Sequence, residues 1–418
     1  MVLNREQRRT DAGVNLLLAE QRPPIMNAQF PRTLRLMIVA GDASGDGHGA
    51  SLVQALHELA PQTEIKFFGA TGARLRAAGV ESIVDTDKLS ILGLWEIGTA
   101  LPKFLAAYRK LKQSVLDRKP NAVILIDWPD FNLRLAKWLQ RRGTRVIYYV
   151  SPQLWAWRSH RARNIRRDVD LLLSILPFEK EWYALRGMTH VEYVGHPFAG
   201  NVVAAYDREE FCRRHNLDPA RPIISLLPGS RHKEVARILP PMLAAAQAIA
   251  LQRDDVQFVV VVAPNRDPNE AEQIISSSNS QPATLHLIHH ETREALAASD
   301  VAAIASGTAT LEAALLGTPM VIVYKESPIN WHLLGKMIKV EHYGLVNLIA
   351  ERRVAPELMQ NDCNGERMAK ELLEMLNSDR QYAIRAELQS VTDKLDAGGS
   401  QRAAQKILSF IESTTTGS

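Results

Sequence analysis

Short, largely apolar runs separated by stretches of helical periodicity constrain the fold of this 418-residue chain more than any other feature. Strands buried on both faces read as continuous apolar runs, which is typical of parallel sheets covered by helices. Six runs form a first set: residues 34–40, 65–68, 122–126, 146–150, 171–175 and 191–194. Five more follow at 223–227, 256–262, 285–288, 301–304 and 321–323. The chain is therefore predicted to be α/β, with two consecutive doubly wound units and a cleft between them.

The same pattern predicts the division into domains. Residues 1–30 are expected to be a mobile N-terminal extension, because their apolar stretch is too short for a signal-peptide core. Residues 31–200 and 201–375 are predicted to form the two α/β domains, and residues 376–418 to add C-terminal helices. The final helices are expected at 366–376 and 379–412. The apolar stretch 301–324 is broken by SGTAT and GTP, so no membrane-spanning helix is expected.

Charge is distributed unevenly between the two halves. Residues 31–198 hold 24 Lys and Arg against 16 Asp and Glu, a net charge of +8, whereas residues 199–418 carry −5. A basic half suggests an anionic partner: a phosphorylated substrate, a membrane surface or a nucleic acid. Two cysteines cannot form a disulfide framework or a Cys-based zinc site, which fits a reducing compartment. Asp85 and Asp87 resemble a DxD motif, but they follow a short strand in an early connection and are expected to be solvated, so no metal is expected.

The first glycine-rich loop, GDASGDGHG, follows the run at 34–40. It half matches a dinucleotide fingerprint, but the second strand ends in FFG without the acidic residue that NAD binding requires. The glycines are interpreted as letting the backbone approach an acceptor sugar. A tight turn between strand and helix is the structural alternative.

Two aspartates follow the buried run AVILI. Parallel sheets bind ligands beyond the carboxyl ends of their strands, so Asp127 is predicted to be a general base there. Asp130 is expected instead to cap the helix through residues 133–139.

The next loop, SPQLWAW, precedes RSHRARNIRR. The arginines of the second stretch, beside the tryptophans of the loop, could bind nucleic acid or anionic lipid, or they could form a solvated helix face.

Two further loops resemble phosphate cradles in the second half. Gly229, Ser230 and Arg231 combine a helix start with a guanidinium that can hold two phosphate oxygens. The loop SGTAT begins another helix, in which Glu312 could accept hydrogen bonds from ribose hydroxyls. The two cradles together suit a diphosphate.

Several longer motifs resemble those of the lipid-A-disaccharide synthase family, which are inverting glycosyltransferases of the GT-B class. They are GDASGD, IDWPDFN, YVSPQLWAWR, LPFEKEWY, VGHP, LLPGSRHKEV, ASGTATLEAALLGTPMV and LVNLIAERR, in the family's order from about residue 34 to about residue 360. The resemblance implies a GT-B fold with two Rossmann-like domains facing a central cleft. It implies transfer of a diacylated glucosamine from UDP to diacylglucosamine 1-phosphate, without a cofactor.

The resemblance also assigns roles to residues. Asp127 matches the family's base, Arg231 its diphosphate arginine, Glu312 the ribose-binding glutamate and Asn347 a UDP-site asparagine. The predicted catalytic residues are therefore Asp127 and Arg231. The predicted substrate-binding residues are Ser44, Gly45, Asp46, Ser151, Trp155, His196, Gly229, Ser230, Ser306, Gly307, Thr308, Thr310, Glu312 and Asn347. Four positions depart from the family pattern: Asp42 replaces Glu, Gly344 replaces Ser, Val346 replaces Pro, and Glu351 replaces a common Gly.

Acylated substrates imply contact with a membrane. Residues 91–112 carry an apolar face with a basic rim, including Trp95, Leu101 and Phe104, and this face is predicted to bind anionic inner-membrane lipid reversibly. Core packing is the alternative. The enzyme is thus expected to be cytoplasmic and peripheral on the inner membrane, without a nucleic-acid partner, and a homodimer stays open. The rival functions are a UDP-sugar epimerase, a peptidoglycan glucosaminyltransferase, or a non-catalytic protein that binds nucleic acid or membrane.

Overall fold

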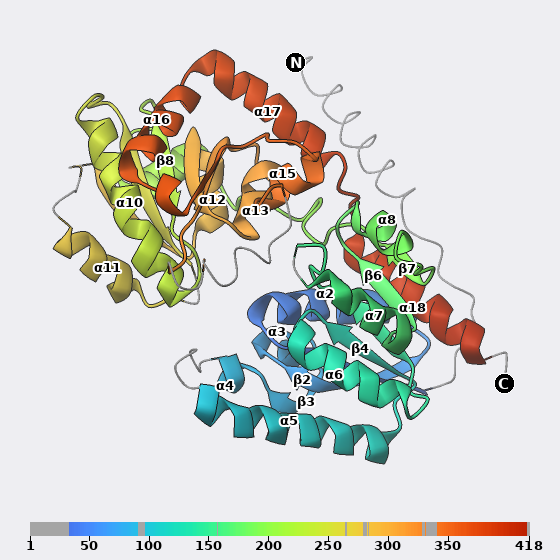
Figure 1. The fold of residues 1–418 in the computed structure, drawn as a ribbon. Helices are drawn as coiled ribbons and strands as arrows, with labels where there is room; N and C mark the ends of the chain where they lie inside the picture. Colours follow the sequence, from blue (N-terminus) through green and yellow to red (C-terminus); the bar gives the residue numbers. More distant parts are fainter. Residues whose placement is uncertain are drawn as a thin grey trace, which may run out of the picture. The chain divides into compact units, whose positions relative to one another are not determined.

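The computed structural model describes residues 33–90, 97–156, 158–263, 266–278, 282, 284–327, 331 and 341–415. Their strands form two parallel sheets of seven and six strands, flanked by helices (Figure 1). This confirms the predicted α/β architecture. The chain divides into two compact units: one holds the described residues up to Ile126 together with those from Ala403 onward, and the other is Asp127–Arg402. The expected extension at 1–30 lies outside the described residues.

The first unit contains four parallel strands in the order β3-β2-β1-β4. Helices α2 and α3 pack on each other, and α5 packs against the edge strand β3 (Figure 1). All five residues of β4 are buried, as the run AVILI predicts. The elements are β1 (Thr33–Ala40), α2 (Ala43–Leu59), β2 (Glu64–Thr71), α3 (Ala73–Ala77), β3 (Glu81–Asp85), α4 (Asp87–Ser90), α5 (Ile97–Arg118) and β4 (Ala122–Ile126).

The second unit begins with the last three strands of the seven-stranded sheet, in the order β5-β6-β7. Short helices follow β5 and β6. The elements are α6 (Pro129–Gln140), β5 (Val146–Tyr149), the 3₁₀ helix η2 (Ser159–Arg161), α7 (Ala162–Asp168), β6 (Leu171–Ser174), α8 (Glu179–Ala184) and β7 (Val191–Tyr193).

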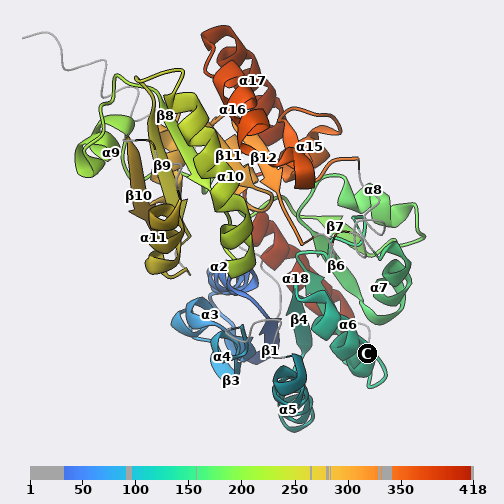
Figure 2. The ribbon, with the colours of Figure 1, turned by 60° about the vertical axis from the view of Figure 1, so that its left-hand side comes forward.

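The six-stranded sheet has the order β10-β9-β8-β11-β12-β13. Helix α10 lies along this sheet and packs on α16 (Figure 2). Helices α12 and α13 pack on each other and on the sheet. The strands are β8 (Ile223–Leu227), β9 (Gln257–Val262), β10 (Leu285–His289), β11 (Val301–Ala305), β12 (Met320–Tyr324) and β13 (Glu357–Met359). The helices are α9 (Arg208–His215), α10 (His232–Ala250), α11 (Pro268–Ser277), α12 (Thr292–Ala298), α13 (Ala309–Leu315), α15 (Leu345–Ala350), the 3₁₀ helix η4 (Gln360–Asp362) and α16 (Gly365–Met375).

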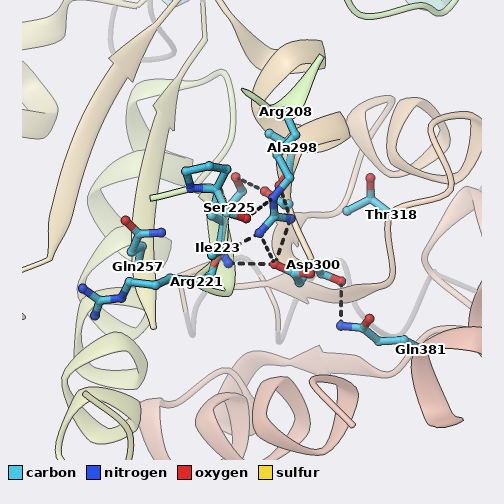
Figure 3. Close-up of polar contacts among 12 residues, drawn as sticks. Arg208, Arg221, Ile223, Ser225, Gln257, Ala298, Asp300, Thr318 and Gln381 are labelled. Carbon is cyan, nitrogen blue, oxygen red and sulfur yellow. Dashed lines mark hydrogen bonds and ion pairs between the residues drawn. The ribbon is translucent and has the colours of Figure 1, made fainter. Parts of the chain in front are cut away.

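An ion pair anchors the starts of two neighbouring strands of this sheet. The Asp300 carboxylate, just before β11, accepts hydrogen bonds from the Ile223 N–H of β8 at 2.8 Å and from both terminal nitrogens of Arg208 at 3.1 Å (Figure 3). Arg208 also donates to the backbone oxygens of Ala298 and Arg221. This cluster lies at the amino ends of the strands, away from the ligand-binding edge of such a sheet.

The C-terminal segment differs from the prediction of one helix over 379–412. Two helices occupy it: α17 (Ser378–Thr392) and α18 (Gly399–Thr415). The break falls at residues 393–398, where Gly398 adopts φ +78°. The backbone oxygen of Asp396 accepts the His196 N–H at 3.2 Å, so the break ties this segment to the strand-end loop at 195–196. None of the described helices has the length and apolar character needed to cross a membrane.

Candidate active site

The glycine-rich loop after β1 is tightly packed. Asp42 is the N-cap of α2 and accepts the Gly45 N–H at 2.7 Å. A Cβ at Gly49 would lie 3.0 Å from a Leu75 methyl, which supports the alternative of a tight, close-packed turn. The exposed Ser44 hydroxyl lies 3.4 Å from the His48 ring, and burial lowers the pKa of His48 to about 4.

Asp46, a predicted substrate residue in this loop, is 3% exposed. Its carboxylate accepts the N–H groups of Gly72 and Arg74, both at 2.7 Å, and of Leu75 at 3.2 Å. These bonds satisfy the start of α3, a role that an aspartate performs at helix N-termini. Within the described contacts, Asp46 acts on the protein backbone.

Asp127 follows β4 in a fixed and strained conformation. Both Asp127 and Trp128 have positive φ, +44° and +49°, which is costly for residues with a Cβ. The Asp127 carbonyl accepts the Tyr148 hydroxyl at 2.5 Å and the Asn132 amide at 2.7 Å, and its N–H reaches the Tyr149 oxygen at 3.3 Å. The Trp128 ring stacks on Phe131 at 4.0 Å between centroids. The loop therefore holds a half-buried carboxylate on a rigid backbone.

The prediction that Asp130 caps a helix is wrong. Helix α6 begins at Pro129, and its N-cap is Trp128, which makes no side-chain capping bond. Asp130 lies inside the first turn, where its carboxylate accepts hydrogen bonds from Arg158 at 3.1 Å and Arg161 at 2.6 Å. The basic segment is thus partly neutralised by α6.

Two buried side chains of α8 fix the loop after β5. The predicted site residue Trp155 donates from its indole nitrogen to Glu179 at 3.0 Å, and the Tyr183 hydroxyl donates to the Pro152 oxygen at 3.1 Å. Ser151 is also buried, at 4% exposure. Burial raises the pKa of Glu179 to about 7, against the opposing effect of its hydrogen bonds with Ser151 and Trp155.

The two predicted phosphate loops start from adjacent strands. Leu227 at the end of β8 pairs with Ile304 of β11, so the loops after these strands leave the same edge of one sheet. Arg231 is the N-cap of α10 and its side chain is 82% exposed. The Glu234 carboxylate accepts the Arg231 guanidinium at 2.8 Å and the backbone N–H groups of Ser230 and Arg231 at 3.1 and 3.2 Å. Glu234 occupies some of the donors that the sequence assigns to phosphate.

The second of these loops holds its hydroxyls close to the backbone. Ser306 donates to the Tyr343 oxygen at 3.1 Å, and Thr310 donates to the Gly307 oxygen at 2.7 Å. Thr308 is the N-cap of α13, which has only seven residues. Glu312, one turn further on, accepts a hydrogen bond from Arg293 at 3.0 Å. An arginine therefore faces the carboxylate that was predicted to bind ribose.

His196 and Asn347 are buried and bonded to neighbouring backbone. His196 Nδ1 accepts the Phe198 N–H at 3.1 Å. The Asn347 oxygen accepts the N–H groups of Val354 and Ala355 at 2.8 and 2.9 Å, and its nitrogen donates to Glu357 at 2.8 Å. Asn347 thus shapes the segment before β13.

Sequence reasoning missed four residues that shape these loops: Asn132, Tyr148, Glu179 and Glu357. Glu179 lies in the quoted motif LPFEKEWY, so its position was available but its burial was not. Tyr148 and Asn132 donate hydrogen bonds to the Asp127 carbonyl from positions 21 and 5 residues further along the chain. No local sequence pattern predicts these contacts.

Part of the predicted membrane segment lies outside the described residues. Positions 91–96 are not described, and neither are the side chains of Trp95 and Leu101. On the described part of α5, Leu111 is buried, whereas Leu105 is 45% exposed. Among the residues that the structure describes, no group of three or more His, Cys, Asp or Glu side chains could hold a metal ion. The Asp85 and Asp87 carboxylates both accept Arg76.

Comparison with solved structures identifies the fold class. S. aureus MnaA in its UDP co-structure has a TM-score of 0.64 at 12% identity, over 90% of this chain and 97% of that one. A putative UDP-N-acetylglucosamine 2-epimerase from Listeria monocytogenes gives 0.58 at 14% identity, over 92% and 98%. The calicheamicin glycosyltransferase CalG4 gives 0.56 at 14%, over 92% and 100%. These likenesses confirm the predicted GT-B fold of two Rossmann-like domains.

Sequence comparison gives the family. A family model described as Lipid-A-disaccharide synthetase matches residues 36–410. The lipid-A-disaccharide synthase of Syntrophus aciditrophicus (strain SB) is 44% identical over 380 residues, or 90% of this chain and 98% of that protein. The enzyme of the same name from Solibacter usitatus (strain Ellin6076) is 42% identical over 386 residues, or 91% and 99%. This chain belongs to the lipid-A-disaccharide synthase family.

Proposed function

We propose that this glycosyltransferase joins UDP-2,3-diacylglucosamine to 2,3-diacylglucosamine 1-phosphate, giving lipid A disaccharide 1-phosphate and UDP. The observation that carries the proposal is the family match over residues 36–410. In the proposed reaction, the acceptor hydroxyl attacks the donor's anomeric carbon from the face opposite UDP. The new glycosidic bond forms as the bond to the diphosphate breaks, so the anomeric configuration inverts.

Asp127 is the proposed general base. It takes the proton of the acceptor hydroxyl, a contribution of about 10²–10⁴-fold in similar reactions. The double hydrogen bond on its own carbonyl supports this role, because a base must be held in one orientation to act. A positive φ at Asp127 and Trp128 is the kind of local strain that is found at functional sites.

Arg231 is proposed to stabilise the departing UDP diphosphate. Its largely exposed guanidinium and the two loops at one sheet edge support this role. Release of Glu234 would free the backbone N–H groups of Ser230 and Arg231 for phosphate oxygens. Both Asp127 and Arg231 must then reach the same UDP-sugar. The other predicted substrate residues, from Ser44 to Asn347, are proposed to line the two substrates.

Asp127→Asn tests this assignment. Turnover of the two diacylated sugars is expected to fall by at least about 10²-fold, while UDP affinity and the melting temperature stay near those of the wild type. Asp117→Asn, an exposed aspartate on α5, is the matched control for the loss of one charge. Near-normal disaccharide formation by folded Asp127→Asn would remove Asp127 from this role. An epimerised UDP-sugar without disaccharide from the wild type would favour the epimerase alternative.

The enzyme is also proposed to sit peripherally on the cytoplasmic face of the inner membrane, with residues 31–200 nearest the acceptor and 201–375 holding UDP. The exposed Leu105 and half-buried Phe104 on α5 support a small apolar contact face. Changing both to Ser is expected to weaken binding to anionic vesicles. Leu116→Ser, a 48% exposed leucine further along α5, is the control. Equal vesicle binding by all three proteins would contradict the membrane face.

A further inference from the structure

Two arginines converge on one carboxylate beside the Asp127 loop. Arg158 and Arg161 both donate to Asp130 Oδ1, at 3.1 and 2.6 Å. Their side chains are 28% and 24% exposed, whereas Asp130 is 59% exposed. The two arginine side chains are thus mostly enclosed by protein, and the carboxylate that joins them is more exposed than either.

This arrangement leaves an excess of positive charge. Arg158, Arg161 and Asp130 together carry a net charge of +1, and Arg163 and Arg166 follow on the next turns, while Arg167 pairs with Asp168. Arginine presents a planar fork that matches phosphate oxygens in pairs. A partly enclosed pair of such forks is a better phosphate site than a single exposed arginine, because less conformational freedom is lost on binding.

The backbone is strained both in the loop that carries Arg158 and in the loop that carries Asp127. Arg158 itself has φ +57° and Val150, at the start of the same loop, has φ +62°. With Asp127 and Trp128, four of the nine non-glycine residues that have positive φ among the described residues fall in these two loops. Such conformations cost about 1–3 kcal/mol each and persist where the surrounding structure enforces them, commonly at functional sites.

The arginine pair lies within reach of the proposed base. Asp130 is three residues from Asp127, so their Cα atoms are at most about 11 Å apart, and closer because the helix begins between them. Both carboxylates also act on one buried hydroxyl: burial chiefly raises the pKa of Tyr148, and the charges of Asp127 and Asp130 add to the rise. The separation between the proposed base and the arginine pair is therefore limited to about the length of a phosphorylated sugar ring.

We propose that Arg158 and Arg161 bind the phosphate monoester of the acceptor sugar. This inference rests on the proposed function, in which the acceptor's hydroxyl meets Asp127 and its 1-phosphate is on the same ring. Asp130 holds the two guanidinium groups in place before the acceptor arrives, and the phosphate then shares or replaces that carboxylate. The pair orients the acceptor for attack, separately from Arg231, which is assigned to the donor diphosphate.

Matched acceptors test the assignment. Initial rates are measured in mixed micelles with 2,3-diacylglucosamine 1-phosphate and with the same sugar carrying a 1-O-methyl group in place of phosphate. For the wild type, loss of the phosphate is expected to lower kcat/KM for the acceptor by about 10- to 100-fold, as for a hydrogen bond between charged groups. For Arg161→Ala, the two acceptors are expected to differ by less than about 3-fold, since one of the two guanidinium groups that read the phosphate is gone and the paired geometry is lost.

Two variants act as controls. Arg163→Ala removes the same charge from the neighbouring, exposed part of the segment and is expected to keep the full preference for the phosphorylated acceptor. Arg161→Lys keeps the charge but loses the paired geometry, so it should retain part of the preference. Arg158→Ala provides a second test if Arg161→Ala does not fold, which its melting temperature shows. KM for the UDP-sugar should stay within about 2-fold in each folded variant, because the donor is bound elsewhere.

The outcomes separate this inference from the proposed function. If the wild type makes disaccharide equally well from both acceptors, the phosphate site is refuted while the transferase function stands. If neither acceptor yields disaccharide, both the function and the site fall. A phospholipid headgroup is the other source of phosphate. In that case Arg161→Ala and Arg163→Ala would both weaken binding to phosphatidylglycerol vesicles and slow both acceptors alike, which would overturn the proposal.

Discussion

Glu179 gives the sharpest test of the loop architecture because its carboxyl group is buried on α8. It is 1% exposed and accepts hydrogen bonds from Trp155 and from the Leu176 N–H, at 3.0 and 3.1 Å. These contacts favour the charged form, but burial outweighs them and raises the pKa of Glu179 from 4.5 to about 7. The folded protein therefore holds a proton on Glu179 at pH values where the unfolded chain has released it.

The sign and size of the pH effect follow from that difference. Where the folded state binds one more proton than the unfolded state, the free energy of unfolding falls by about 1.4 kcal/mol per pH unit. For Glu179 this interval runs from its ordinary pKa of 4.5 to about 7. The contribution is present below the interval and is lost as the pH rises through it, a total of about 3 kcal/mol.

Glu179→Gln removes this titration and keeps an oxygen for the Trp155 indole. The variant should lose about 1–3 kcal/mol at pH 5, because the new amide cannot accept the Leu176 N–H while it accepts Trp155. Relative to the wild type it should then recover about 3 kcal/mol by pH 8. The measurement is urea unfolding followed by circular dichroism at pH 5, 6, 7 and 8.

Glu181→Gln is the control for this experiment, because Glu181 lies on the same short helix but is exposed. Its difference from the wild type should vary little with pH. Parallel stability profiles for the wild type and Glu179→Gln across the range would refute the reasoning, since they would mean that Glu179 binds its proton equally in both states.

Three substitutions test the backbone contacts described above. Asp300→Ala should lower the free energy of unfolding by about 2–4 kcal/mol, because Arg208 loses its partner and a β8 N–H its acceptor; a change below about 0.5 kcal/mol in urea unfolding would contradict this. Gly195→Ala, whose new methyl would meet a backbone oxygen at 2.4 Å, should cost more than the roughly 1 kcal/mol expected for Gly200→Ala, where φ is +76° but the nearest atom, the Ala397 Cβ, lies at an ordinary contact distance of 3.5 Å; equal melting shifts would rule out the steric cause. Glu351→Gly should raise stability by about 0.5–1 kcal/mol because φ is +58° there, and calorimetry that finds a loss would refute it.

Buried parallel strands were predictable from sequence because all of their side chains are buried, so each strand reads as a continuous apolar run. Each predicted run is a strand, and β8, β9 and β11 are buried along their whole length. The strand that sequence reasoning missed, β13, lies at a sheet edge, and so does β3, which was expected only as a short strand before Asp85. An edge strand has one neighbour and faces solvent on part of its surface, so residues such as Glu81 and Glu357 are tolerated there and the apolar signal disappears.

The predicted element boundaries were wrong where two local sequence rules favoured different residues as the helix start or end. Asp130 is a good N-cap by residue type, but Pro129 is favourable at the first helical position and moved the start of α6 upstream. The departure at Glu351 has a related cause. Glu351 is the C-cap of α15 with positive φ, where glycine is the natural choice, so the family's common glycine suits the backbone at this position.

Functional residues were harder to predict because a polar side chain at a strand end has two uses that look alike in sequence. It can meet a ligand, or it can satisfy backbone groups that the turn leaves unpaired. Asp46 and Asn347 make three or more hydrogen bonds to protein, whereas the exposed Arg231 makes its side-chain bond only to Glu234 among the described contacts. The difference depends on partners 7 to 29 residues away. Side chains that stay largely exposed after such bonds are counted, as Arg231 does, are therefore better candidates for ligand contact than motif membership alone can identify.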